Sequence, residues 1–103
     1  MTAHCDISQP DYSGVEIVEP QQRVDDYREA MALANVIAEQ KLCDAMLLSW
    51  YDKDRDFESP QHSSECHQDS ATPGYVDYGL YHGATLKIDF EKGRFVFFYL
   101  RVE

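Results

Sequence analysis

Apolar residues at helical spacing mark the most regular stretch of the chain, between residues 21 and 42. They recur at steps of three and four, with polar residues between them, at Val24, Tyr27, Met31, Ala34, Ile37, Ala38 and Leu42. This spacing places them along one side of an α-helix. Pro20 suits a helix start, because the backbone N–H that proline lacks has no partner in a first turn. The pattern predicts one long amphipathic helix over 21–42.

Alternating patterns on both sides of this helix predict strands. Residues 15–19 alternate Val and Ile with acids, as in a half-buried edge strand. Residues 45–51 are apolar on both alternating sides, as in a strand from the middle of a sheet. Residues 85–90 and 94–101 are joined by Glu91-Lys92-Gly93, which indicates a hairpin. Together they predict an α+β fold: a mostly antiparallel sheet of three to five strands, with the long helix packed on one face.

The hairpin allows two registers, and each leaves a second apolar trio on the opposite face. In both registers the first strand contributes Leu86, Ile88 and Phe90. The second strand adds to their face either Phe95, Phe97 and Tyr99 or Val96, Phe98 and Leu100. One helix covers one face of a small sheet, so the other trio needs the aromatic segment 75–83, the N-terminal arm or another chain over it. We favour a second copy and predict a homodimer, because most protein oligomers are symmetric.

A polar connector over 52–74 separates the strand run that ends at Tyr51 from the aromatic segment. Connectors of this length without their own structure are usually binding loops or disordered. Phe57 and the prolines near both ends of the connector favour an ordered loop across the sheet. Residues 1–13 are polar and predict a flexible arm. Residues 14–103 then form a single domain.

Composition narrows the classes of partner and compartment. The chain has 103 residues, 44% of them hydrophobic, which suffices for one packed core. Its net charge of -10 argues against nucleic acid and anionic membrane surfaces as partners. Cys5, Cys43 and Cys66 lack paired spacing, so a disulfide framework is not expected. With no signal-peptide pattern and no membrane-spanning apolar run, we predict a cytoplasmic protein.

Histidine and cysteine gather in the connector as HSSECH. His62, Cys66 and His67 lie there, and His82 follows in the aromatic segment. Imidazole and thiolate are ligands that zinc or iron prefers, so these residues are the candidate metal ligands. The adjacent side chains of Cys66 and His67 diverge in extended backbone, and no CxxC or HExxH spacing supports them. A polar surface loop is therefore favoured over a metal site.

The connector offers two further candidate types of site. Cys66 is a candidate nucleophile or redox thiol, with His62 or His82 as its base. The acids of 52–58 resemble a calcium loop, but Phe57 stands where the sharp turn needs glycine. The interleaved Lys53 and Arg55 favour a solvated, self-paired turn instead. Enzyme activity is left open.

Aromatic side chains supply the candidate ligand surface. Trp50 precedes the connector, and Tyr75, Tyr78 and Tyr81 follow it, offering flat rings with polar tips. Glycines beside these tyrosines permit a close backbone approach or a bulge. We predict a non-enzymatic, self-associating module with a small binding site over 52–82. The alternative is a metal-binding protein or a small thiol enzyme.

Three stretches together carry a resemblance to a known family. They are LLSWYD at 47–52, FESPQHSSECH at 57–67 and YVDYGLYHGATL at 75–86. The chain resembles a family of small uncharacterised prokaryotic proteins from about residue 27 onward. No activity is assigned to that family, so the resemblance implies an α+β single domain and transfers no catalytic residues.

Overall fold

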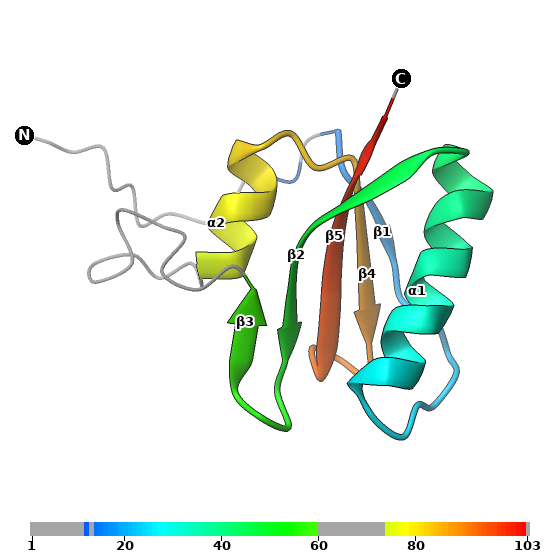
Figure 1. Cartoon of the computed structure of the whole chain (residues 1–103), viewed down its shortest axis with the longest axis vertical. Coiled ribbons are helices and arrows are strands. Elements are labelled where there is room, and N and C mark those ends of the chain that lie inside the picture. Colours follow the sequence, from blue (N-terminus) through cyan, green and yellow to red (C-terminus); the bar gives the residue numbers. More distant parts are fainter. Residues whose placement is uncertain (1–11, 13, 60–73, 103) are drawn as a thin grey trace, which may run out of the picture.

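A five-stranded sheet with a helix on each face organises the described part of the chain, residues 12, 14–59 and 74–102 of a computed structural model (Figure 1). The elements in chain order are β1 (Glu16–Val18), α1 (Tyr27–Leu42), β2 (Ala45–Asp52), β3 (Phe57–Ser59), α2 (Gly74–Tyr81), β4 (Leu86–Phe90) and β5 (Phe95–Arg101). Across the sheet the strands follow the order β1-β4-β5-β2-β3. Only β1 and β4 are parallel among these described strands; the other neighbours are antiparallel. The predicted α+β class, with a mostly antiparallel sheet and a long helix on one face, is confirmed.

The helix α1 begins at Tyr27, six residues later than the apolar spacing predicts. Asp26 is its N-cap and accepts hydrogen bonds from the backbone N–H groups of Arg28 and Glu29, both at 3.1 Å. Glu29 in turn accepts one from the Asp25 N–H at 2.7 Å. The Asp26 side chain thus satisfies two N–H groups that a helix leaves unpaired at its start, and Glu29 binds the residue before the cap. The predicted start near Pro20 is wrong, because the Asp26 cap sets the first turn at Tyr27. Val24 lies before the helix but is still buried in the core, which is why it fitted the apolar spacing.

Alanines form the surface of α1 that meets the sheet. Ala30, Ala34 and Ala38 are buried completely or almost completely, within a core that includes Leu86 and Phe97. Because an alanine side chain is short, the helix backbone lies close to the strands. Neither of the two described helices is long and apolar enough to cross a membrane.

The hairpin β4–β5 adopts the first of the two predicted registers. Phe90 pairs with Phe95 and Ile88 with Phe97, and these side chains belong to the core under α1. Val96 and Phe98 therefore point to the other face, where they pack with α2. The aromatic segment is thus a helix that covers Val96 and Phe98 of the second trio within one chain, while Leu100 stays half-buried. A homodimer stays a prediction, but most of the face that motivated it is covered by α2.

The first part of the connector is a hairpin rather than a loop. β3 pairs with the end of β2, with Phe57 opposite Asp52. Arg55 in the turn donates from Nε to Asp52 Oδ2 at 2.7 Å, which confirms the predicted self-pairing. The predicted solvation is wrong for Asp52, which is only 1% exposed. Residues 60–73 of the connector and nearly all of the predicted arm lie outside the described residues.

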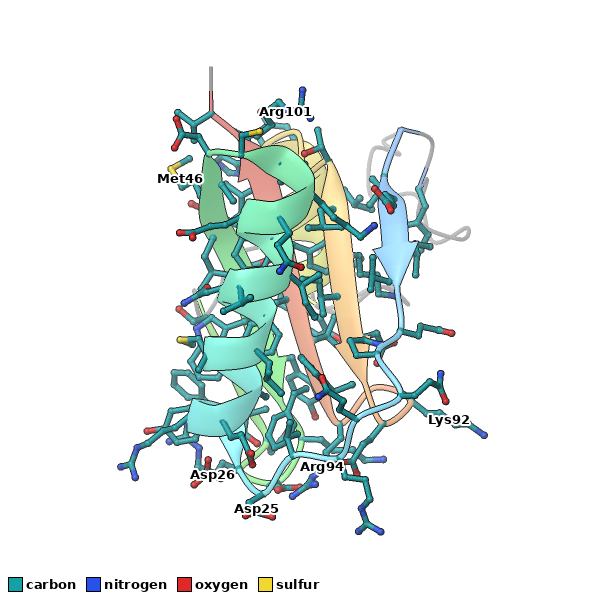
Figure 2. All side chains as sticks on the ribbon, turned by 90° about the vertical axis from the view of Figure 1, so that its right-hand side faces the viewer. Asp25, Asp26, Met46, Lys92, Arg94 and Arg101 are labelled. Carbon is teal, nitrogen blue, oxygen red and sulfur yellow. The ribbon has the colours of Figure 1, made fainter. Side chains whose placement is uncertain are left out.

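One guanidinium connects three loops at the end of the molecule where α1 begins (Figure 2). Arg94 donates to the carbonyls of Val24 at 2.9 Å and Asp25 at 3.1 Å. It also donates to Asp54 Oδ2 at 2.7 Å and lies 3.1 Å from Glu91 Oε2. The hydrogen bond from Arg94 holds the pKa of Asp54 below its usual range. These charges therefore fix loops to one another.

Candidate functional site

The start of α2 is fixed to the sheet by hydrogen bonds and by ring stacking. Glu58 on β3 accepts from the Tyr75 N–H at 3.1 Å, and Ser49 on β2 donates to the Tyr75 carbonyl at 2.6 Å. The Tyr75 ring stacks on Tyr51, with centroids 4.9 Å apart and an interplanar angle of 6°. Carboxylates are favourable at the positive end of a helix dipole. Tyr75 is therefore held in place by its surroundings.

Burial disfavours the charged form of the Tyr75 hydroxyl. Desolvation, followed by the neighbouring Tyr12 and Asp89, raises the pKa of Tyr75 well above its ordinary value. Desolvation also raises the pKa of Asp89, against the effect of a 2.6 Å hydrogen bond from the Gly93 N–H. Lys87 lies beside this group, with Nζ 4.8 Å from the centre of the Tyr12 ring. Burial therefore disfavours the charged forms of both Tyr75 and Asp89.

A histidine and two tyrosines stand together at the other end of α2. His82 Nδ1 lies 2.9 Å from the Tyr78 carbonyl, and the two rings stack at 4.0 Å. The Tyr81 ring meets His82 edge-on at 5.4 Å and is 87% exposed. A carbonyl only accepts, so Nδ1 must carry the proton and donate it. In the neutral imidazole this leaves Nε2 with its lone pair, available to a donor or a metal.

The predicted ligand-binding residues are divided between the two faces of the sheet. Trp50 packs with the core under α1, whereas Tyr75 packs with the core under α2. Tyr78 and Tyr81 lie with His82 at the end of α2. Ligand binding stays a prediction, and the four aromatic residues do not form one surface in this fold.

The predicted metal and thiol residues are mostly outside the described part of the chain. His62, Cys66 and His67 all fall in residues 60–73, so their role stays a prediction. His82 is the predicted ligand that the structure does describe, and it is exposed. Within residues 14–59 and 74–102, no group of three His, Cys, Asp or Glu side chains is arranged to hold a metal ion.

An exposed apolar group at the edge of the sheet was missed by the sequence reasoning. β3 pairs only with the last three residues of β2, so no strand in the described ranges adjoins the outer edge of residues 45–49. Met46 lies opposite Leu100 across the β2–β5 pair, and Val102 follows two residues later. Met46 is 47% exposed and Val102 is 44% exposed, whereas Leu100 is half-buried. We call Met46, Leu100 and Val102 the Met46 patch; Figure 2 shows Met46 at the rim of the molecule near Arg101.

The pattern of residues 45–51 could not reveal this edge. It indicates burial on both faces of a strand, and β2 does have a helix over each face. Whether a strand also has a neighbour along its whole edge depends on how long the adjacent strand is. Here the adjacent strand is β3, which is short and was not predicted from the sequence.

Comparisons with known proteins give a family and a similar fold. A family model described as Domain of unknown function (DUF5619) matches residues 15–99, which run from β1 to β5. The chain is similar to the crystal structure of AF1514, a protein from Archeoglobus fulgidus DSM 4304 described as novel, with 30% identity and a TM-score of 0.59. That similarity covers 85% of this chain and 93% of the other. No curated protein matches the sequence.

Proposed function

The chain belongs to the family described as a domain of unknown function, DUF5619, and we propose that it acts as a non-enzymatic, self-associating binding module. The family assignment confirms the resemblance inferred from the sequence. The observation that supports self-association is the Met46 patch, because it lies beside the outer edge of β2. Exposed apolar groups at a strand edge favour pairing with another chain.

A second copy suits this edge for geometric reasons. Two identical strand edges related by a two-fold axis run antiparallel, so each copy offers the other the same set of backbone N–H and C=O groups. Met46 and Leu100 lie on the same face of the sheet, as cross-strand neighbours. Pairing of β2 with β2 would bring the two Met46 patches together and remove apolar surface from water.

We expect a substitution at Met46 to abolish this self-association. The wild-type chain should have twice the monomer mass of 11.9 kDa in multi-angle light scattering after size exclusion. Met46→Lys should have the monomer mass, because a charge on the patch has to be desolvated when two edges pair. Val36→Lys is the matched control, since Val36 is 52% exposed on α1, away from the edge.

Two results would contradict the proposal. One is a wild-type chain that stays monomeric at every concentration tested. The other is a dimer that survives Met46→Lys, which would place the interface elsewhere on the molecule.

A cytoplasmic location also remains a prediction from the sequence.

As a second candidate function we propose metal binding through His82 together with His62, Cys66 and His67. The observation that favours it is the hydrogen bond from His82 Nδ1 to the Tyr78 carbonyl. Metal-binding histidines usually donate their second ring N–H to such an acceptor, which orients the ring and fixes the tautomer. Zinc or iron would be the cofactor expected of these ligands.

Elemental analysis of untagged protein, purified without chelator, tests this second candidate. We expect about one zinc or iron per chain in the wild type, since histidine and thiolate sites hold a single ion. His82→Ala and Cys66→Ser should both lose it. His4→Ala is the control, because it removes a histidine outside the proposed set. A wild type without metal, or equal metal in all four proteins, would refute the metal site and leave self-association unaffected.

A further inference from the structure

Three aromatic rings from separate elements form an open box where β2 ends. Tyr27 is the first residue of α1, Trp50 lies on β2, and Phe57 begins β3. The Trp50 ring stacks on Tyr27 at 5.6 Å and 18° and meets Phe57 at 5.3 Å and 56°. All three side chains are half-buried. We call these three residues the aromatic box.

Arg55 occupies this box. Its guanidinium carbon lies 4.0 Å from the centre of the Tyr27 ring and 5.0 Å from that of Phe57. Its Nε donates to Asp52 Oδ2 at 2.7 Å. Asp52 is 1% exposed, whereas the Arg55 side chain is 48% exposed. A buried carboxylate and the rings of Tyr27 and Phe57 thus contact a cation that still reaches the solvent.

The box does not depend on Arg55 for its shape. Trp50 also stacks on Phe97 of β5, at 5.9 Å and 7°, which fixes it in the sheet. Tyr27 and Phe57 are placed by the start of α1 and by the pairing of β3 with β2. Arg55 lies in the exposed turn between β2 and β3. Its side chain can therefore leave the box while the rings and Asp52 stay where they are.

The geometry points to the aromatic box with Asp52 as a binding site for a guanidinium group, which Arg55 fills in the free protein and an external guanidinium replaces. Flat cations stack on aromatic rings, and a guanidinium also donates N–H groups to a carboxylate. A quaternary ammonium ion satisfies the rings but has no N–H for Asp52. The net charge of -10 raises the local concentration of cations around the chain. The fitting ligand is an arginine side chain or a small guanidino compound.

This site is separate from the proposed self-association. Trp50 and Asp52 lie at the opposite end of β2 from Met46. A failure of one proposal therefore leaves the other standing.

Tryptophan fluorescence tests the exchange directly, because Trp50 is the only tryptophan in the chain. We expect ethylguanidinium, titrated at constant ionic strength, to bind Arg55→Ala about tenfold more tightly than the wild type. The wild type can bind the ligand only in the fraction of molecules whose site is not filled by Arg55, and this lowers its apparent affinity. Removing the Arg55 side chain makes every site available. Tetramethylammonium should bind Arg55→Ala at least about tenfold more weakly than ethylguanidinium does, because it cannot donate to Asp52.

Arg28→Ala is the matched control. It removes the same charge from α1, and the Arg28 guanidinium lies 5.5 Å from the same Tyr27 ring. It leaves the hydrogen bond between Arg55 and Asp52 in place, so it should tighten ethylguanidinium binding far less than Arg55→Ala does. If Arg55→Ala does not fold, Arg55→Gln keeps an N–H donor for Asp52 while it removes the charge, and the same titration is made on it.

Equal binding of ethylguanidinium by the wild type, Arg28→Ala and the Arg55 variant would overturn the inference. So would equal binding of the two cations. A Gly-Arg-Gly peptide that binds the Arg55 variant better than Gly-Lys-Gly supports a basic protein as the source of the guanidinium. Binding of ethylguanidinium without the peptide supports a small guanidino compound; both results support the guanidinium site.

Discussion

Replacing Gly79 with alanine should destabilise the protein by about 2–3 kcal/mol, because the added methyl group has no room. A Cβ at this position would lie 2.8 Å from Phe98 Cγ, 2.9 Å from Phe98 Cβ and 3.1 Å from Ser49 Oγ. Phe98 is fully buried, so it cannot move aside without disturbing the core. Elsewhere in a helix the same change stabilises by about 1 kcal/mol. Urea unfolding followed by circular dichroism measures the difference.

Tyr81→Ala is the control for Gly79→Ala. It changes an 87% exposed side chain in the same helix, so its effect should stay within about 0.5 kcal/mol. If Gly79→Ala equals or exceeds the wild type in stability, α2 does not pack on β5 as closely as the 2.8 Å distance to Phe98 Cγ requires.

Replacing Ala34 with leucine should destabilise the protein by about 3 kcal/mol. Ala34 is completely buried and lies between Ala30 and Ala38 on the surface of α1 that meets the sheet. A larger side chain there pushes the helix away from the strands. That shift also separates Asn35 from the Tyr99 hydroxyl, which donates to it at 2.6 Å. Equilibrium unfolding in urea is again the measurement.

Ala32→Leu separates overpacking from helix propensity. Ala32 is exposed on the same helix, and leucine is nearly as good a helix former as alanine. Its stability should therefore remain within about 0.5 kcal/mol of the wild type. Similar losses in Ala34→Leu and Ala32→Leu would show that close packing against the sheet is not the cause.

Both predictions concern the same feature of the architecture. Each helix packs on its face of the sheet at a very small residue, Ala34 of α1 and Gly79 of α2. Large aromatic side chains on the strands fill the space that these small residues leave. Substitutions at the two sites act on opposite faces, so their effects should be close to additive.

Local patterns in the sequence were enough for the long helix and the hairpin. The three-and-four spacing of apolar residues predicted α1. Alternation over 85–90, followed by a turn and a second β-prone run, predicted β4 and β5 in two alternative registers, of which the structure adopts one. These signals are local, because a helix or a hairpin buries one side of a continuous segment. The start of α1 was missed although Asp26 and Glu29 have capping-box spacing, since the apolar spacing continued back to Val24.

The tertiary structure decided what the aromatic segment and the connector became. Tyrosines and glycines favour helix only weakly, so residues 74–81 form α2 because packing on Val96 and Phe98 stabilises them there. That packing requires glycine at 79, because the helix backbone lies close to Phe98 there. The sequence indicated that the glycines permit a close backbone approach, but not which residue would be approached. A second copy was not needed to cover this face.

Sequence alone determined which residues are apolar, where one helix and one hairpin form, and which family the chain resembles. Only the tertiary structure decided which distant side chains meet. Tyr27, Trp50 and Phe57 form one box because α1 begins beside the end of β2 and because β3 pairs with that end. Met46 is exposed because β3 is too short to reach it. Contacts of this kind depend on the lengths and crossing points of neighbouring elements, which no local pattern records.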